Sequence, residues 1–267
     1  MMGIFFMAAA TSVAALWTSV TTALGIGTVV GLGSAGAVGA TSVPPPHGAR
    51  VGLRGIALRH VLPLLLLLPV VLLASEVDNV VKALLPAPDV AQIVADTHAE
   101  LPTDTELSLF ETAIVAVGLV PVVEEWFFRG VVQQGLVANL GAAGGILVTS
   151  LLFALGHGAL GGISPEAWAA YVAQTLLLGL VLGYARHATG SLVASILLHM
   201  GVNGLGVLGM ALPDLVAIPG YNAPGAHTPL AVLIPGCLAV ALGLWLLSRE
   251  TPEPVPPLPD VAATPDD

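Results

Sequence analysis

Two adjacent carboxylates, Glu124 and Glu125, and the arginine Arg129 lie in a stretch otherwise built almost wholly of apolar residues. An ionised side chain at the centre of a bilayer costs about 2.5–3.5 kcal/mol on insertion scales, so charges at this depth must be paired or used in chemistry. Glu125 and Arg129 are one helical turn apart, in the acid-first order that favours an ion pair. Glu124 projects about 100° away from Glu125 on a helix, so it is the carboxylate left for chemistry.

Two histidines and an asparagine provide the other polar groups of the apolar segments. The glycine-rich segment 141–145 predicts a chain reversal, and Glu124 precedes it by about as much as His157 follows it. In an antiparallel hairpin these two residues share a depth. His199 and Asn203 are four residues apart and lie on one face of a later helix. If that helix packs against the hairpin, all four side chains converge on one pocket.

Such a set of side chains supports two forms of hydrolysis, and the sequence leaves both open. Without a metal, Glu124 and His157 could take a proton from water while His199 and Asn203 hydrogen-bond the developing oxyanion. With a metal, Glu124, His157 and His199 could bind Zn or another divalent ion, with water in the open position. The structural alternatives are an interhelical ion pair, a histidine at a helix end, and interhelical hydrogen bonds.

The composition identifies the elements that must position these residues as membrane-spanning helices. Of the 267 residues, 56% are hydrophobic and 9% are charged, with a mean hydropathy of +0.93, far from the values of a soluble chain. The fold class is therefore all-α, a polytopic transmembrane helical bundle of about seven spans, with six to eight compatible with the pattern. The net charge is −10 and the few basic residues form no patch, so nucleic-acid binding is excluded. The single cysteine, Cys237, permits no intrachain disulfide.

Apolar runs and their breakers divide the chain into one membrane domain with two flanking segments. We expect residues 1–46 to form an N-terminal hydrophobic helix, with a span over Gly3–Leu24 and a signal-like character. Residues 47–248 form a membrane-embedded domain, and its core at 107–212 holds the candidate catalytic residues. Residues 249–267 form a disordered acidic and proline-rich tail. The further expected spans are 61–74, 107–138, 146–157, 168–184, 191–212 and 230–247.

The arginines predict how the chain is oriented. Five of them fall on one side of these spans: Arg50, Arg54, Arg59, Arg186 and Arg249. By the positive-inside rule this side, together with the C-terminal tail, is cytoplasmic. The acidic segment 76–106 faces outward. The alanine- and glycine-rich composition with almost no lysine suggests a bacterial protein of the inner (plasma) membrane.

Three motifs carry a resemblance to a known family. Glu124, Glu125 and Arg129 match EExxxR; Phe153 and His157 match FxxxH; His199 and Asn203 match HxxxN. In this order and on separate spans, they resemble the CPBP family of CAAX proteases and bacteriocin-processing enzymes, also called Abi. The resemblance covers about residues 107–212. It implies an intramembrane endopeptidase in which Glu124 and His157 activate water, His199 and Asn203 assist, and Glu125 and Arg129 orient the site.

The expected function is hydrolysis of a peptide bond near the membrane-anchored, C-terminal end of a protein or peptide substrate. Substrates that the resemblance allows are a prenylated CAAX protein, a bacteriocin or immunity peptide, and a C-terminal sorting signal, as in myxosortase-type members. The expected partners are that substrate and the lipid bilayer, and the sequence does not specify an oligomeric state. The rival functions are a proton- or ion-coupled transporter and a non-catalytic membrane scaffold.

Overall fold

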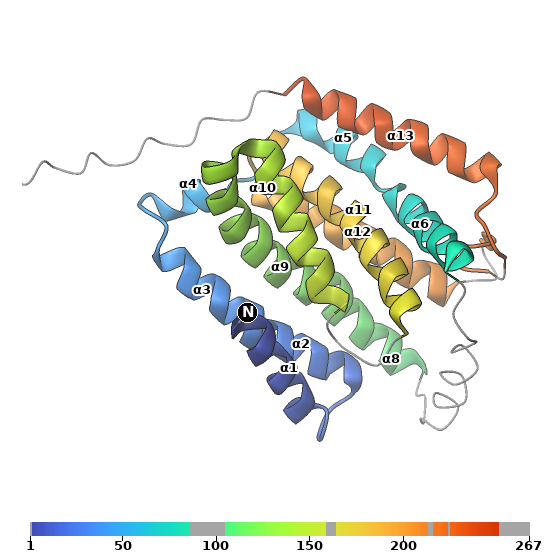
Figure 1. The fold of residues 1–267 in the computed structure, drawn as a ribbon, viewed down its shortest axis with the longest axis horizontal. Helices are drawn as coiled ribbons and strands as arrows, with labels where there is room; N and C mark the ends of the chain where they lie inside the picture. Colours follow the sequence, from blue (N-terminus) through green and yellow to red (C-terminus); the bar gives the residue numbers. More distant parts are fainter. Residues whose placement is uncertain (1, 86–104, 159–163, 213–215, 224, 251–267) are drawn as a thin grey trace, which may run out of the picture.

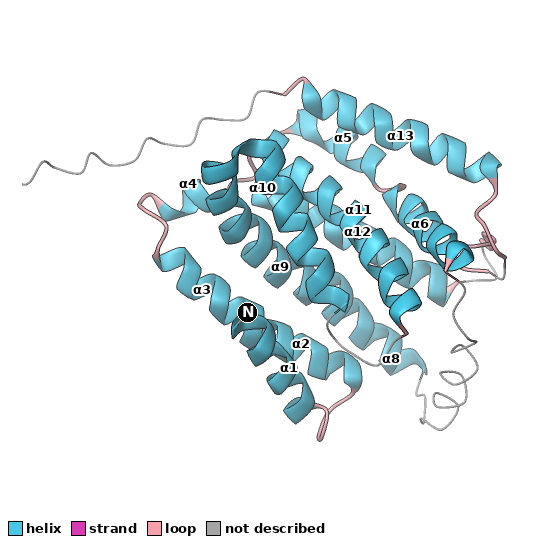
Figure 2. Ribbon diagram, in the orientation of Figure 1, coloured by secondary structure: helices cyan, strands magenta, loops and turns pink. Residues whose placement is uncertain are grey.

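The computed structural model describes residues 2–85, 105–158, 164–212, 216–223 and 225–250. Every regular element in these ranges is a helix, which confirms the all-α prediction (Figure 2). Most of the acidic segment and all of the expected disordered tail beyond residue 250 lie outside the described residues. In chain order the helices are α1 Met2–Ala14, α2 Val20–Thr28, η1 Val29–Gly33, α3 Ser34–Thr41, α4 His47–Val51, α5 Leu58–Leu67, α6 Val70–Leu84, α8 Thr105–Thr112, η2 Ala113–Leu119, α9 Val120–Glu125, η3 Trp126–Val132, α10 Gln133–Gly158, α11 Pro165–Thr189, α12 Leu192–Ala211 and α13 Leu230–Ser248.

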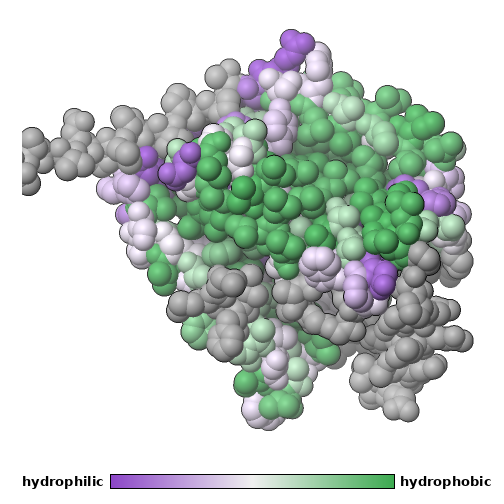
Figure 3. Space-filling model, viewed as in Figure 1, coloured by the Kyte–Doolittle hydropathy of each residue, from purple (hydrophilic) through white to green (hydrophobic). Residues whose placement is uncertain are grey.

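The described residues contain six continuous helical stretches long and apolar enough to cross a membrane. They are Val20–Thr41, Leu58–Leu84, Leu109–His157, Pro165–Thr189, Leu192–Ala211 and Leu230–Ser248. Figure 3 shows apolar side chains over the middle of one face and hydrophilic groups toward its margins, the pattern of a surface that faces lipid. The polytopic helical bundle is thus confirmed.

The stretch of 49 residues over Leu109–His157 is a hairpin rather than one crossing. The chain reverses at Gly141, where φ is +72° and ψ is 173°, a conformation that only glycine adopts readily. Gly145 lies so close to the backbone of Val137 that a Cβ atom there would overlap it. The two arms of this hairpin are the antiparallel pair expected on either side of segment 141–145, and counting them separately gives the seven expected crossings.

The N-terminal hydrophobic segment forms a second helical hairpin, so the expected single helix over Gly3–Leu24 is wrong. Helix α1 ends at Ala14, and Ser19 begins α2 by accepting a hydrogen bond from the backbone of Thr22 at 3.1 Å. The glycine-rich part that follows belongs to the span Val20–Thr41, the main span of this hairpin. Glycines on this span let α1 approach closely, because a Cβ atom at Gly31 would overlap Gly3 and Met7.

Helices α11 and α12 occupy the middle of the bundle. Figure 1 shows them between the hairpin arms of α9 and α10 on one side and α5, α6 and α13 on the other, with α1–α3 outside α9. The largest apolar core lies among α5, α11, α12 and α13, where Leu67, Leu182 and Leu247 are fully buried. This core holds α11 and α12 in place, and the hairpin of Gly141 packs against these two helices.

Three stretches of π-helix interrupt the described helices, and two of them flank α9, which carries Glu124. They are η1, η2 and η3, and η3 begins at Trp126, directly after the two glutamates. A π-helical turn holds about one residue more than an α-helical turn, so it changes which side chains face a given neighbour. Single π turns inside α-helices are frequent at functional sites, which directs attention to the glutamates on this helix.

Candidate active site

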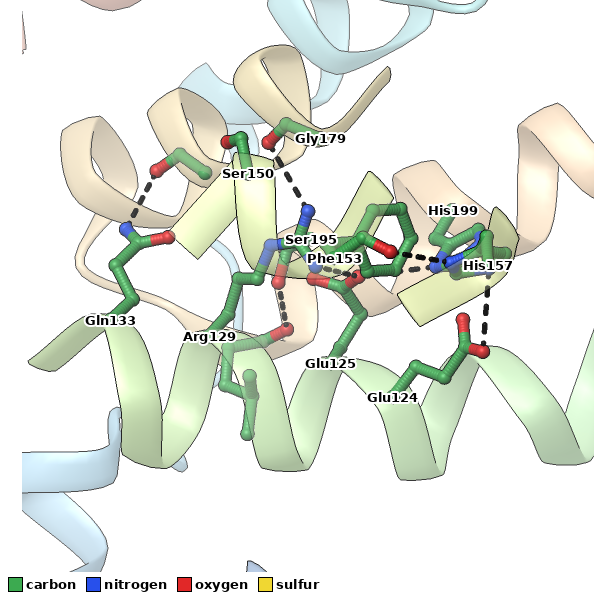
Figure 4. A network of polar contacts seen from close by, with 12 residues as sticks. Glu124, Glu125, Arg129, Gln133, Ser150, Phe153, His157, Gly179, Ser195 and His199 are labelled. Atoms are coloured by element: carbon green, nitrogen blue, oxygen red, sulfur yellow. Dashed lines mark hydrogen bonds and ion pairs between the residues drawn. The ribbon is translucent and has the colours of Figure 1, made fainter. Parts of the chain in front are cut away.

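Glu124 and His157 meet across the hairpin. Glu124 lies in the last turn of α9, His157 lies in the last turn of the second arm of α10, and their Oε1 and Nε2 atoms are 3.5 Å apart (Figure 4). Glu124 is 4% exposed, and its second oxygen, Oε2, is buried without a hydrogen-bond partner. A buried carboxylate oxygen needs a donor, so this atom marks a place for water or for a polar substrate group.

The position of the other ring nitrogen fixes the tautomer of His157. Its Nδ1 atom lies 2.8 Å from the carbonyl oxygen of Phe153, one turn earlier, and only a protonated Nδ1 can bond to that acceptor. Neutral His157 therefore presents a bare Nε2 atom to the carboxylate of Glu124. Two acceptors face each other, and a shared proton or a water molecule that donates to both satisfies them.

Glu125, Arg129 and His199 form a separate, fully enclosed group. Glu125 and Arg129 are both 0% exposed, and Oε1 of Glu125 lies 3.2 Å from Nη1 of Arg129 and 3.1 Å from Nδ1 of His199. Arg129 also donates from Nη2 to the carbonyl oxygen of Gly179 at 3.1 Å, and its guanidinium lies 4.3 Å from the centre of the Phe153 ring. The expected ion pair is present, and it ties the first hairpin arm to α11.

His199 contacts the buried ion pair through its Nδ1 atom. The expectation was that His199 joins Glu124, His157 and Asn203 around one cavity, but its Nδ1 atom contacts Glu125 instead. Asn203, one turn further along α12, does line the cavity with Glu124 and His157. Its Nδ2 atom donates to the carbonyl oxygen of Ala116 at 2.8 Å, and an amide NH₂ group has a second hydrogen to donate.

The cavity itself has a volume of about 570 Å³, which is in the range of sites that bind small molecules or peptide segments. Its walls come from most elements of the bundle, including the N-terminal hairpin, α6, both arms around Gly141, α11 and α12. Thr21 and Leu32 contribute from the N-terminal hairpin, which the sequence motifs do not include. Glu124 and His157 are the only pair of acidic and basic groups among its lining residues.

The metal-binding alternative requires Glu124, His157 and His199 to converge on one point. Among the residues that the structure describes, no three His, Cys, Asp or Glu side chains are arranged to hold a metal ion. Of the expected set, Glu124 and His157 come together, whereas His199 lies with Glu125. The mechanism proposed below therefore uses protein side chains alone.

Several cavity residues were missed by the sequence reasoning. Tyr171, Gln174, Thr175 and Leu178 follow one another at helical spacing on α11 and all line the cavity. The Tyr171 and His157 rings are 6.3 Å apart between centroids. The signal was present as three polar residues at positions i, i+3 and i+4 in an apolar span, which is the face of one helix.

Comparison with known families agrees with this geometry. Residues 106–205 match the family model described as type II CAAX prenyl endopeptidase Rce1-like. This segment is therefore similar to that family. The match contains all three motifs and both arms of the Gly141 hairpin, and it leaves the N-terminal hairpin, α5, α6 and α13 outside. The match supports CAAX-type intramembrane endopeptidase activity in general. No curated protein and no solved structure matched the chain.

Proposed function

We propose that the chain is an intramembrane endopeptidase in which Glu124 activates water. The observation that carries this proposal is the unpartnered Oε2 atom of Glu124, buried in a cavity beside the bare Nε2 atom of His157. Water between these acceptors loses a proton to Glu124 as its oxygen attacks the substrate carbonyl carbon. The protonated Glu124 then gives that proton to the leaving amine as the C–N bond breaks. The products are a carboxylic acid and an amine, and one water molecule is consumed.

The remaining polar groups have two proposed roles, which are to stabilise the oxyanion and to hold the helices of the site in position. Asn203 lines the cavity, and we assign its second amide hydrogen to the oxyanion of the tetrahedral intermediate. We assign His199 a positioning role together with Glu125 and Arg129, because Glu125 contacts both of the other side chains. Their role is to hold the first hairpin arm at the depth of His157.

Replacement of Glu124 tests the proposal. In lipid nanodiscs, Glu124→Gln should lower cleavage of a membrane-anchored peptide reporter by a factor on the order of 10³, since general-base groups contribute about 10²–10⁴. Glu166→Gln is the matched control, because Glu166 is a carboxylate of α11 outside the cavity lining. It should cleave at the wild-type rate. Cleavage by Glu124→Gln at the wild-type rate would refute the mechanism.

The arginines suggest the side from which substrates reach the site. Arg186 donates to the carbonyl oxygen of Val51, Ser191 donates to that of Arg54, and Arg59 pairs with Glu250, so the basic residues of these segments gather at one end of the bundle. The cavity lies toward the other end, where Ser75, Thr112 and Tyr221 line it. With the arginine end cytoplasmic, the site opens on the extracytoplasmic side.

This orientation favours an exported protein with a membrane-anchored end as the substrate. Two reporters that place the same cleavable segment on opposite sides of the membrane distinguish the possibilities in cells. Cleavage should occur in the reporter whose segment is extracytoplasmic and should require Glu124. Cleavage of the cytoplasmic reporter alone would reverse the proposed orientation.

A further inference from the structure

A second cavity lies next to the candidate active site. It has a volume of about 460 Å³ and is lined almost wholly by apolar residues of α5, α6, α12 and the segment that follows α12. Among the described residues, Val71 and Tyr221 line both this cavity and the one that holds Glu124. Both side chains thus lie where the two cavities adjoin, and Tyr221 is the larger of them.

Hydrogen bonds on both sides of Tyr221 hold its backbone in place. The carbonyl oxygen of Gly220, a residue with φ of +71°, accepts hydrogen bonds from Ser75 Oγ at 2.9 Å and Asn79 Nδ2 at 2.8 Å, both on α6. Asn222 donates from Nδ2 to the carbonyl oxygen of Gly209 on α12 at 3.1 Å. The segment is thus fixed to both helices that line the two cavities, and a connection that only joined helices would need neither bond.

The ring of Tyr221 is fixed as well. Its hydroxyl donates to the carbonyl oxygen of Leu205 at 3.0 Å. Partial burial raises the pKa of this hydroxyl above its ordinary value, so it stays protonated and donating around neutral pH. Gly209 leaves room for the ring, because a Cβ atom at this position would lie 3.3 Å from Cε1 of Tyr221 and 3.4 Å from its hydroxyl oxygen.

We propose that Tyr221 is a specificity-determining residue that limits the size of the apolar substrate group bound beside the scissile bond. The ring ends the catalytic cavity, and its removal joins that cavity to an apolar space of about 460 Å³. Burial of each additional CH₂ group changes binding by about fourfold, so a bulky side chain at this place discriminates strongly between short and long apolar groups. Tyr221 lies outside the matched residues 106–205, and the inference rests on the proposed peptidase function.

The test compares which bonds are cleaved. Wild-type protein and variants in nanodiscs are given a membrane-anchored peptide library whose residues beside the anchor vary from alanine to phenylalanine, tryptophan and an octyl side chain, and the products are sequenced by mass spectrometry. Tyr221→Ala should raise the ratio of large to small apolar residues beside the cleaved bond by about tenfold or more, in line with the CH₂ contribution. Tyr221→Phe, which keeps the ring, should leave the ratio within about twofold, below the effect of one CH₂ group.

Tyr221→Trp separates a size limit from a loss of stability. A larger ring should shift the ratio toward small residues, the opposite of the alanine variant, and a merely destabilised protein cannot produce opposite shifts. An unchanged ratio in both the alanine and the tryptophan variant, whatever the total yield, would overturn the proposal.

Affinity selection from the same library distinguishes failure of this inference from failure of the proposed function. The selection uses Glu124→Gln with and without Tyr221→Ala, so it needs no cleavage. A shift of the bound peptides toward large residues on replacement of Tyr221, with no cleavage by the wild type, would refute the peptidase and support the size limit. Wild-type cleavage with no shift in bound or cleaved peptides would refute the size limit alone.

Discussion

Oε1 of Glu124 and Nε2 of His157 face each other at 3.5 Å, while the other nitrogen of His157 is held by the carbonyl oxygen of Phe153. The FxxxH spacing is what makes this possible, because four residues is one helical turn and lets the histidine bond back to the phenylalanine carbonyl. The motif thus fixes the tautomer as well as the position of the imidazole. It leaves the side facing Glu124 without a hydrogen, ready to accept one from water.

Glu124 and His157 should act as one unit. His157→Gln should lower kcat by about 10²–10⁴ with little change in KM, because the lost contact is made to water and not to the substrate. The double variant Glu124→Gln/His157→Gln should be hardly slower than the slower single variant. Rate measurements on the three proteins under saturating reporter decide this, and effects that multiply in the double variant would show two independent roles.

The buried pair of Glu125 and Arg129 should matter mainly for stability. Glu125→Gln leaves the guanidinium of Arg129 without its counter-charge at 0% exposure, and breaking a buried pair in this way costs about 3–5 kcal/mol. Thermal or denaturant unfolding in detergent measures the loss in the free energy of unfolding. Lys82→Gln is the matched control, since it breaks the exposed pair with Asp78 and should cost less than about 1 kcal/mol. Equal losses for both variants would contradict the buried-pair argument.

Chelation should leave the activity intact. The described residues offer no three metal-binding side chains in one place, and His199 is committed to Glu125. Purified protein dialysed against a strong chelator should therefore keep its cleavage rate, and elemental analysis should find much less than one metal ion per chain. Loss of activity on chelation that is restored by one divalent ion, together with loss of that ion in His157→Ala, would establish a metal site.

Close contact within the N-terminal hairpin should be required for a complete cavity. A leucine at Gly31 would overlap the backbone of Gly3 and Met7, so Gly31→Leu should separate α1 from the main span and lower both stability and cleavage. Overpacking of this kind typically costs about 1–3 kcal/mol. Gly206→Ala is the control, because nothing lies within 4 Å of a Cβ atom at that position. Disulfide cross-linking between cysteines placed on α1 and the main span would report the separation.

The spans and the depth of the two principal residues could be predicted from the sequence, and the partner of His199 could not. Apolar runs have a length set by the bilayer, and equal distances from a glycine turn place Glu124 beside His157 without further information. The direction of His199 depends on how α12 is rotated against the first hairpin arm, and the π-helical turns η2 and η3 change that arm's phase. The N-terminal hairpin was missed for a similar reason, since the break at Ser19 depends on a single capping side chain.

The turn at Gly141 also sets where along a membrane anchor a bond can be cut. Residues 124–141 extend about 25 Å at 1.5 Å per residue, and the hydrocarbon layer is about 30 Å thick. With the turn at one membrane surface, Glu124 lies within roughly one or two helical turns of the opposite surface. Under the proposed function, a bond cut at this depth lies where an anchor enters the bilayer, so the helical middle of the anchor need not unwind. Inserting one residue between Glu124 and the turn would shift Glu124 along the helix axis relative to His157. The two residues keep the same depth only if both arms change length together.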